Sequence, residues 1–486
     1  MKQSQLIARN IVVVLSSEII GFGLNFLVII LLARYLGTIG FGNYSFIIAF
    51  VGVFQLLADS GLSNIMIREV SVNKENLSYQ MGVTKSLIWV LSVFVFLIIL
   101  VVINILNTAT EIKHATYIMG LALLAMVHAI GYGAIFKALE EIKFNAAGFI
   151  LHKIVLLSLT ILIIRYKLGL IEIAVAHLFS NMLLWFFYYT IISYRYVKPK
   201  MIFNIKTWWY FITEAAPVGA SSILRKISWQ VDILILSQLG SVASVGLFSA
   251  PYRIIQSLTL LPYTLAIPLF PHLSRLGRSS HKELFQTFEK TMKFMYLLSV
   301  PFFVILATLS YTIILLIFGE KYIDSYIALQ LLSVTVLFLF PTTQFIYLFS
   351  ALGNQRFYTI CSVVGIIVNI GLDIILIPRL DFIGACIGTL VAEISLFAVG
   401  VYYTKLLRSD ISYLRASWKP LAAGVLMWAV LFPFRNAHSA WVIVGLCASL
   451  VAYVFSVFSL KTFTNREIEI MKGSIWLTKG PGTEQL

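Results

Sequence analysis

Residues 86–106 read SLIWVLSVFVFLIILVVINIL and contain no charged side chain. About 20 such residues in a helix cross the hydrocarbon core of a bilayer. The rest of the chain has the same character, because only 12% of its 486 residues are charged and 60% are hydrophobic. Soluble domains carry about 25% charged residues. A soluble fold, a disordered chain, a coiled coil and a disulfide scaffold are therefore excluded, and the sequence predicts an all-α integral membrane protein.

Apolar stretches of this kind predict fourteen transmembrane helices. They cover residues 10–33, 44–66, 86–106, 115–136, 146–164, 169–192, 211–237, 243–267, 294–318, 326–351, 358–377, 383–404, 420–434 and 439–460. The stretches are too long and too continuously apolar for β-barrel strands, which span a membrane in about 9–11 alternating residues. The first stretch is too long for a signal peptide and shows no clear cleavage motif.

The basic residues lie mainly on one side of these helices. With a cytoplasmic N-terminus, the inside segments hold 25 of the 36 Lys and Arg residues, and the outside loops hold seven. Cytoplasmic loops of membrane proteins are enriched in Lys and Arg. We therefore predict that both termini are cytoplasmic. The net charge of +15 then reflects topology and not a nucleic-acid surface.

The short loops argue against an enzyme. No outside loop exceeds about ten residues in this topology, whereas a membrane glycosyltransferase, polymerase or ligase usually needs an extramembrane catalytic segment. The sequence has no G-x-x-x-x-G-K-[ST], H-E-x-x-H or G-x-S-x-G motif. The three Cys residues lie in apolar runs without metal-ligand spacing. We predict a transporter with no catalytic residue and no metal site.

An internal repeat supports this interpretation, because parallel repeats are typical of transporters. LGTIGFGNYS (36–45) matches LGSVASVGLFS (239–249), and KFNAAGFILHKIVLLSLTILII (143–164) matches RFYTICSVVGIIVNIGLDIILI (356–377). The repeat predicts two six-helix lobes, residues 1–200 and 201–410. Two extra helices in 411–460 and a cytoplasmic tail, 461–486, would follow.

Three segments resemble a known family. They are LLARYLGTIGFGNYSFIIAFVGVFQLLADSGLSNIMIREV (31–70), GLFSAPYRIIQSLTLLPYTLAIPLFPHLSRL (246–276) and GNQRFYTICSVVGIIVNIGLDIILIPRLDFIGACIGTLVAEI (353–394). They resemble the O-antigen and exopolysaccharide flippases of the multidrug/oligosaccharidyl-lipid/polysaccharide (MOP) exporter superfamily.

The resemblance implies a fold, a cargo and a location. The two lobes would surround a central cavity and work by alternating access in the cytoplasmic (inner) membrane. The cargo would be an undecaprenyl-diphosphate-linked oligosaccharide that moves to the outer leaflet for surface polysaccharide assembly. A glycan polymerase or another assembly protein would be a possible partner besides the lipid bilayer.

Several basic residues fall inside predicted helices, where a charge costs at least about 2.5–3.5 kcal/mol. Arg225, Arg253 and Lys153 lie near mid-depth. A guanidinium can bind phosphate oxygens through two hydrogen bonds. We interpret these three residues as cavity cations that bind the lipid diphosphate. The alternative is that they form ion pairs between the lobes.

Acidic residues also fall inside the predicted helices. Asp59, Asp232, Glu393 and Glu18 are candidates for coupling transport to H⁺ or Na⁺, or for pairing between the lobes. No other cofactor is expected.

Other functions stay open at this point. They are a cation-coupled multidrug exporter of the same superfamily, a peptidoglycan-precursor flippase and a membrane-embedded glycan enzyme. Fixed arginines at mid-depth would repel cationic drugs, and the short loops disfavour an enzyme.

Overall fold

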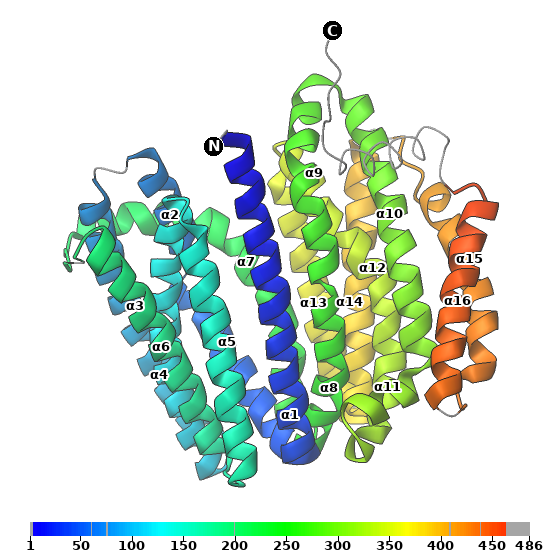
Figure 1. The fold of residues 1–486 in the computed structure, drawn as a ribbon, viewed down its shortest axis with the longest axis horizontal. Coiled ribbons are helices and arrows are strands. Elements are labelled where there is room, and N and C mark those ends of the chain that lie inside the picture. Colours follow the sequence, from blue (N-terminus) through cyan, green and yellow to red (C-terminus); the bar gives the residue numbers. More distant parts are fainter. Residues whose placement is uncertain are drawn as a thin grey trace, which may run out of the picture. The chain divides into compact units, whose positions relative to one another are not determined.

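The computed structural model describes residues 3–59, 61–73, 76–198, 200–407, 410–437 and 439–462, and every regular element in these ranges is helical (Figure 1). The helices are α1 (Gln3–Asp59), α2 (Leu62–Val72), α3 (Leu77–Ile105), α4 (Thr110–Ala138), α5 (Ile142–Arg165), α6 (Leu170–Arg195), α7 (Ile205–Leu239), α8 (Val242–Leu258), α9 (Leu260–Ser279), α10 (His281–Thr308), α11 (Ser310–Ile317), α12 (Tyr326–Ala351), α13 (Gln355–Leu380), α14 (Phe382–Leu406), α15 (Tyr413–Leu431) and α16 (Ser439–Ser459). Short 3₁₀ turns cover Glu320–Ser325 and Phe432–Phe434. The predicted all-α membrane fold is confirmed.

The number of spanning segments is compatible with fourteen. Twelve segments of the described chain are long and apolar enough to cross a membrane. One of them, Val12–Val72, contains a break at Gly37, whose φ of 65° ends one helical stretch and starts the next. Glycine adopts this left-handed conformation without steric cost. The break falls in the loop predicted between spans 10–33 and 44–66. The further predicted span, 211–237, lies within α7.

The chain divides into two compact units. The first comprises Met1–Leu260, Ile314–Ala328 and Arg356–Val399, and the second comprises Leu261–Ile313, Leu329–Gln355 and Gly400–Leu486. The predicted lobe boundaries at residues 200 and 410 stay a prediction.

Large side chains fill the core of the first unit where α2, α3, α4 and α6 meet. Met66, Met81, Phe136, Tyr188 and Ile192 are all buried in this cluster. α3, α4 and α6 are apolar on nearly every side, as expected of membrane spans, so packing and not apolar periodicity selects the faces that meet in this cluster. Figure 1 shows α3, α4, α5 and α6 lying along one another.

The first pair of repeated segments packs together within this unit. A Cβ at Gly42 would lie 2.1 Å from the backbone oxygen of Val242, and a Cβ at Gly246 would lie 2.1 Å from that of Thr38. The contact is reciprocal, because each segment places a glycine against the backbone of the other. Only residues without a side chain allow α1 and α8 to approach this closely.

In the second unit, α10, α15 and α16 form a compact group. Val300, Met427 and Tyr453 are buried in its core, and the Tyr453 hydroxyl donates a hydrogen bond of 2.9 Å to the carbonyl oxygen of Leu297. The two helices that follow the predicted repeat are thereby attached to α10.

Candidate functional site

A cavity of about 230 Å³ lies in the first unit between α1, α4, α5, α6 and α7. Its polar lining consists of Gln55, His152, Lys153, His177, Asn181 and Gln230. No Asp or Glu is among the described residues that line it. The cavity therefore offers a cation and several hydrogen-bond donors, and its chemistry suits an anion.

Lys153 provides the positive charge of this cavity. Its Nζ donates a hydrogen bond of 2.9 Å to Asn25 Oδ1 and lies 5.7 Å from the centre of the Phe149 ring. Within the described ranges, no carboxylate forms a salt bridge with Lys153. A neutral amide thus holds the ammonium in place without cancelling its charge.

Two histidines lie beside Lys153, and the sequence analysis did not include them among the site residues. His177 Nε2 lies 3.2 Å from the Tyr44 hydroxyl. His152 is 3% exposed. The Asn181 side chain lies beside its ring, but neither ring nitrogen makes a hydrogen bond of good geometry with a described residue. Buried polar atoms are normally hydrogen-bonded, so these nitrogens are available to a water molecule or a ligand.

The other two predicted cations are not brought into this cavity. Arg253 is half-buried on α8, and its Nη1 donates a hydrogen bond of 2.9 Å to Gln256 Oε1. Like Lys153, it has no carboxylate partner in the part of the chain that the structure describes. Arg225 belongs to α7, and its side chain lies outside the described residues.

A second polar site of the first unit joins α7, α13 and α14. Asp232 and Asp373 are both fully buried, and Asn369 is 3% exposed. Asn369 Nδ2 donates a hydrogen bond of 2.7 Å to Asp232 Oδ1, while Asp373 and Thr389 lie beside the same carboxylate. A Cβ at Gly388 would lie 2.2 Å from Asp373 Oδ1, so only a glycine at this position leaves room for the carboxylate against α14.

This carboxylate cluster carries more negative charge than its described neighbours neutralise. The Asp373 and Asp232 carboxyl groups lie within hydrogen-bond reach of each other, and no other described group donates a hydrogen bond to Asp373. Neither Asp232 nor Asp373 forms a salt bridge with a described residue. An isolated buried carboxylate is very costly, so a proton or a bound cation must compensate. Carboxylate, amide and hydroxyl oxygens are ligands for hard cations.

The remaining predicted acids lie elsewhere. Asp59, at the end of α1, accepts a hydrogen bond of 2.6 Å from the Ser63 hydroxyl. Glu393 is half-buried on α14, with its Oε1 fully covered. Glu18 is half-buried on α1. Of the four predicted acids, the structure thus brings only Asp232 into the carboxylate cluster.

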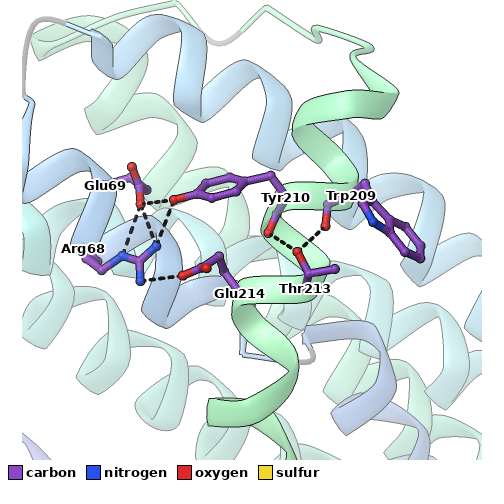
Figure 2. A network of polar contacts seen from close by, with 6 residues as sticks. All are labelled: Arg68, Glu69, Trp209, Tyr210, Thr213 and Glu214. Carbon is purple, nitrogen blue, oxygen red and sulfur yellow. Dashed lines mark hydrogen bonds and ion pairs between the residues drawn. The ribbon is translucent and has the colours of Figure 1, made fainter.

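An exposed ion-pair network connects α2 with the start of α7 (Figure 2). The Arg68 guanidinium lies 2.9 Å from Glu69 Oε1 and 2.9 Å from Glu214 Oε2. The Tyr210 hydroxyl accepts a hydrogen bond of 3.2 Å from Arg68 and donates one of 3.3 Å to Glu69. Arg68 therefore has carboxylate partners, in contrast to Lys153 and Arg253.

Half-buried cations and buried carboxylates that do not pair with each other, within an all-helical membrane fold, are typical of a membrane transporter. In such proteins, intramembrane ionisable residues mark the paths of substrates and ions.

Comparison with known proteins identifies the family. The sequence profile of the family described as "Polysaccharide biosynthesis protein" matches residues 7–277. The chain belongs to this family, the polysaccharide flippase branch of the MOP superfamily. A protein of Shigella flexneri named "Putative O-antigen transporter" is 22% identical over 373 residues, which cover 73% of this chain and 87% of the relative.

Solved structures share the fold. The lipid II flippase MurJ in an inward closed conformation matches with a TM-score of 0.72 at 19% identity, over 93% of this chain and 98% of MurJ. An inward-facing multidrug resistance MATE transporter of the MOP superfamily matches with a TM-score of 0.66 at 16% identity, over 80% and 96%. These structures show that the chain shares their fold. The prediction of a transporter agrees with the family and with the name of the Shigella flexneri relative.

Proposed function

We propose that this protein is a flippase for an undecaprenyl-diphosphate-linked oligosaccharide. It moves this cargo from the cytoplasmic to the outer leaflet of the inner membrane by alternating access, for surface polysaccharide assembly. The observation that carries the proposal, beside the family, is the cavity around Lys153, which contains a cation and hydrogen-bond donors but no described carboxylate.

An anionic cargo fits this cavity better than a cationic drug. The Lys153 ammonium attracts the diphosphate and repels a drug of like charge. Asn181 and the two histidines add hydrogen-bonding groups around the same space. A cavity of about 230 Å³ is too small for an oligosaccharide. Its role is therefore to hold the charged group while the glycan moves through a wider path and the polyprenyl chain stays in lipid.

Arg253 is the second cation that we assign to the diphosphate. Among the described residues, its side chain hydrogen-bonds only to the neutral Gln256 side chain, so its positive charge remains for a ligand. Arg225 retains the same role as a prediction from the sequence. A glycan polymerase or another assembly protein would receive the cargo on the outer side.

The carboxylate cluster supplies the coupling site. Asp232, Asn369, Asp373 and Thr389 would bind H⁺ or Na⁺, and the bound cation would neutralise the buried carboxylates. A state with the cation and a state without it then differ in electrostatic energy, which allows an ion gradient to bias the conformational cycle.

The experiment is complementation of a strain that lacks this gene. Lys153→Ala and Arg253→Ala should abolish the surface polymer, and lipid-linked oligosaccharide should accumulate in the cytoplasmic leaflet. Protein abundance in the membrane should stay near normal. Lys143→Ala is the matched control, because Lys143 lies on the same helix, is exposed and pairs with Glu141.

Three results would contradict the proposal. Full transport in both alanine variants would remove the role of the two cations. Loss of transport in proportion to loss of protein would indicate that the two side chains stabilise the fold and do not bind the cargo. An intact polymer combined with lowered dye resistance in the deletion strain would favour the multidrug exporter.

A further inference from the structure

The second unit contains a basic cavity that takes no part in the sites described above. It has a volume of about 350 Å³ and lies where α10 and α15 begin and α16 ends. Its lining consists of Gln286, Glu289, Lys290, Lys293, Arg415, Ala416, Lys419, Lys461 and Thr462. Five of these nine residues are basic and one is acidic, so the cavity has a strong positive charge.

Backbone contacts fix two of these basic side chains. Lys419 Nζ donates a hydrogen bond of 2.8 Å to the carbonyl oxygen of Lys461, and Lys293 Nζ donates one of 3.0 Å to that of Thr462. The carbonyl group of Lys461 is neutral, so it leaves the positive charge of Lys419 in place. Lys290 and Arg415 are exposed, and neither forms a salt bridge with a described carboxylate. The cavity is therefore a preformed site for an anion with several oxygens.

Large apolar side chains lie on α15 and α16 next to the cavity. Leu414 and Trp418 flank Arg415 and Lys419, and they are 76% and 46% exposed. Phe455 and Phe458, in the last turns of α16 before Lys461, are 72% and 55% exposed. A ligand of this surface thus meets cations at one end and an apolar helix face at the other. A phospholipid has this combination of a charged headgroup and acyl chains.

We propose that this cavity binds the phosphate headgroup of an anionic phospholipid, with its acyl chains along α15 and α16. The predicted topology places the start of α10, the start of α15 and the end of α16 on the cytoplasmic side. Basic pockets between transmembrane helices on that side are suited to anionic lipid headgroups. The lipid would hold the C-terminal helix pair against α10. A lipid diphosphate has related chemistry, so the test separates these two sources.

The probe is brominated phosphatidylglycerol, a quencher of tryptophan fluorescence, in phosphatidylcholine vesicles that contain the full-length protein. Trp418 is the reporter, because Lys419 Nζ lies 5.7 Å from its ring. Its contribution is the difference between the wild type and Trp418→Phe. We expect stronger quenching by brominated phosphatidylglycerol than by brominated phosphatidylcholine. Unlabelled phosphatidylglycerol should reverse the additional quenching.

Charge variants test the cavity itself. The triple variant Lys290→Gln, Arg415→Gln and Lys419→Gln should lower the preference for the anionic lipid by about tenfold or more. The single variant Arg415→Gln removes an exposed side chain that has no salt bridge with a described carboxylate, and it should lower the preference by about twofold to fivefold. The matched control is Arg275→Gln, Arg278→Gln and Lys282→Gln. It removes the same charge from exposed residues that do not line the cavity, and it should keep the preference.

Three outcomes would overturn the proposal. The first is an unchanged preference in the triple variant and in Arg415→Gln. The second is an equal loss in the matched control, which would indicate general electrostatic attraction. The third outcome comes from a competition experiment in which unlabelled undecaprenyl diphosphate replaces unlabelled phosphatidylglycerol. If it reverses the quenching at a far lower mole fraction than phosphatidylglycerol does, the cavity serves the lipid diphosphate. Because the binding assay requires no transport, its result is independent of the proposed flippase activity.

Discussion

The substitution Gly388→Ala tests the carboxylate cluster without removing any of its polar groups. The new Cβ would lie 2.2 Å from Asp373 Oδ1 and 3.4 Å from Asn369 Nδ2. The Asp373 oxygen would then have to move by about 1 Å to reach ordinary contact, at an overpacking cost of about 1–3 kcal/mol. Replacing a helical glycine with alanine returns about 1 kcal/mol. The fold should survive while the carboxylate leaves its place.

The expected result is a transporter that inserts normally but no longer responds to its coupling cation. If the cation is Na⁺, it should stabilise the purified wild type against thermal unfolding, by about 2.7 kcal/mol at a hundredfold excess over Kd. If the cation is H⁺, the stabilisation should instead be present at low pH and fall as pH rises. Gly388→Ala should lose the response and the surface polymer in the complementation assay.

Gly371→Ala is the matched control for this prediction. Gly371 lies on α13 between Asn369 and Asp373, and a Cβ there would meet nothing within 4 Å. It should keep transport and the cation response. The reasoning is refuted if Gly388→Ala transports and responds like the wild type. It is also refuted if Gly371→Ala loses as much, because general helix perturbation would then account for the effect.

Three further results are expected. A topology reporter fused after residue 240 should be outside and one after residue 280 inside, and an outside signal after residue 280 would overturn the predicted orientation. Glu214→Gln should lower the free energy of unfolding by less than about 1 kcal/mol in thermal unfolding, because its pair with Arg68 is exposed; a loss of several kcal/mol would contradict this. Met427→Ala should cost about 2–5 kcal/mol in the same assay, because Met427 is fully buried. Val425→Ala, at an exposed position, is its control and should cost little.

The spans could be predicted from the sequence because the bilayer requires them. Each apolar stretch of about 20 residues must be helical, since its backbone groups have no other partners in lipid. Apolar composition does not specify where a helix continues through a predicted loop. α1 continues to Asp59 with a break at Gly37, and α2 starts separately at Leu62 within the predicted span 44–66. Local backbone geometry decides these boundaries.

The candidate sites were predictable only within single helices. Asn369 and Asp373 are four residues apart and therefore share a face of α13, a signal that the sequence analysis did not use. The hydrogen bond from Asn369 to Asp232 joins residues 137 positions apart, and no helical periodicity encodes it. The position of His152 could not be predicted either, because the cavity that it lines is formed by α6 and α7 as well as by its own helix, α5.

The separation of charges in the first unit bears directly on mechanism. Lys153 and Arg253 have amide partners and Asp232 has Asn369, although pairing cations with carboxylates would be the cheaper arrangement in a low-dielectric core. Arg68 shows that this chain does form such pairs where they lie exposed. Under the proposed function, the two sites of opposite charge take two ligands of opposite charge, an anion in the cavity and a cation in the carboxylate cluster. An anionic cargo coupled to H⁺ or Na⁺ meets both requirements, whereas a cationic drug would leave Lys153 without a counter-charge.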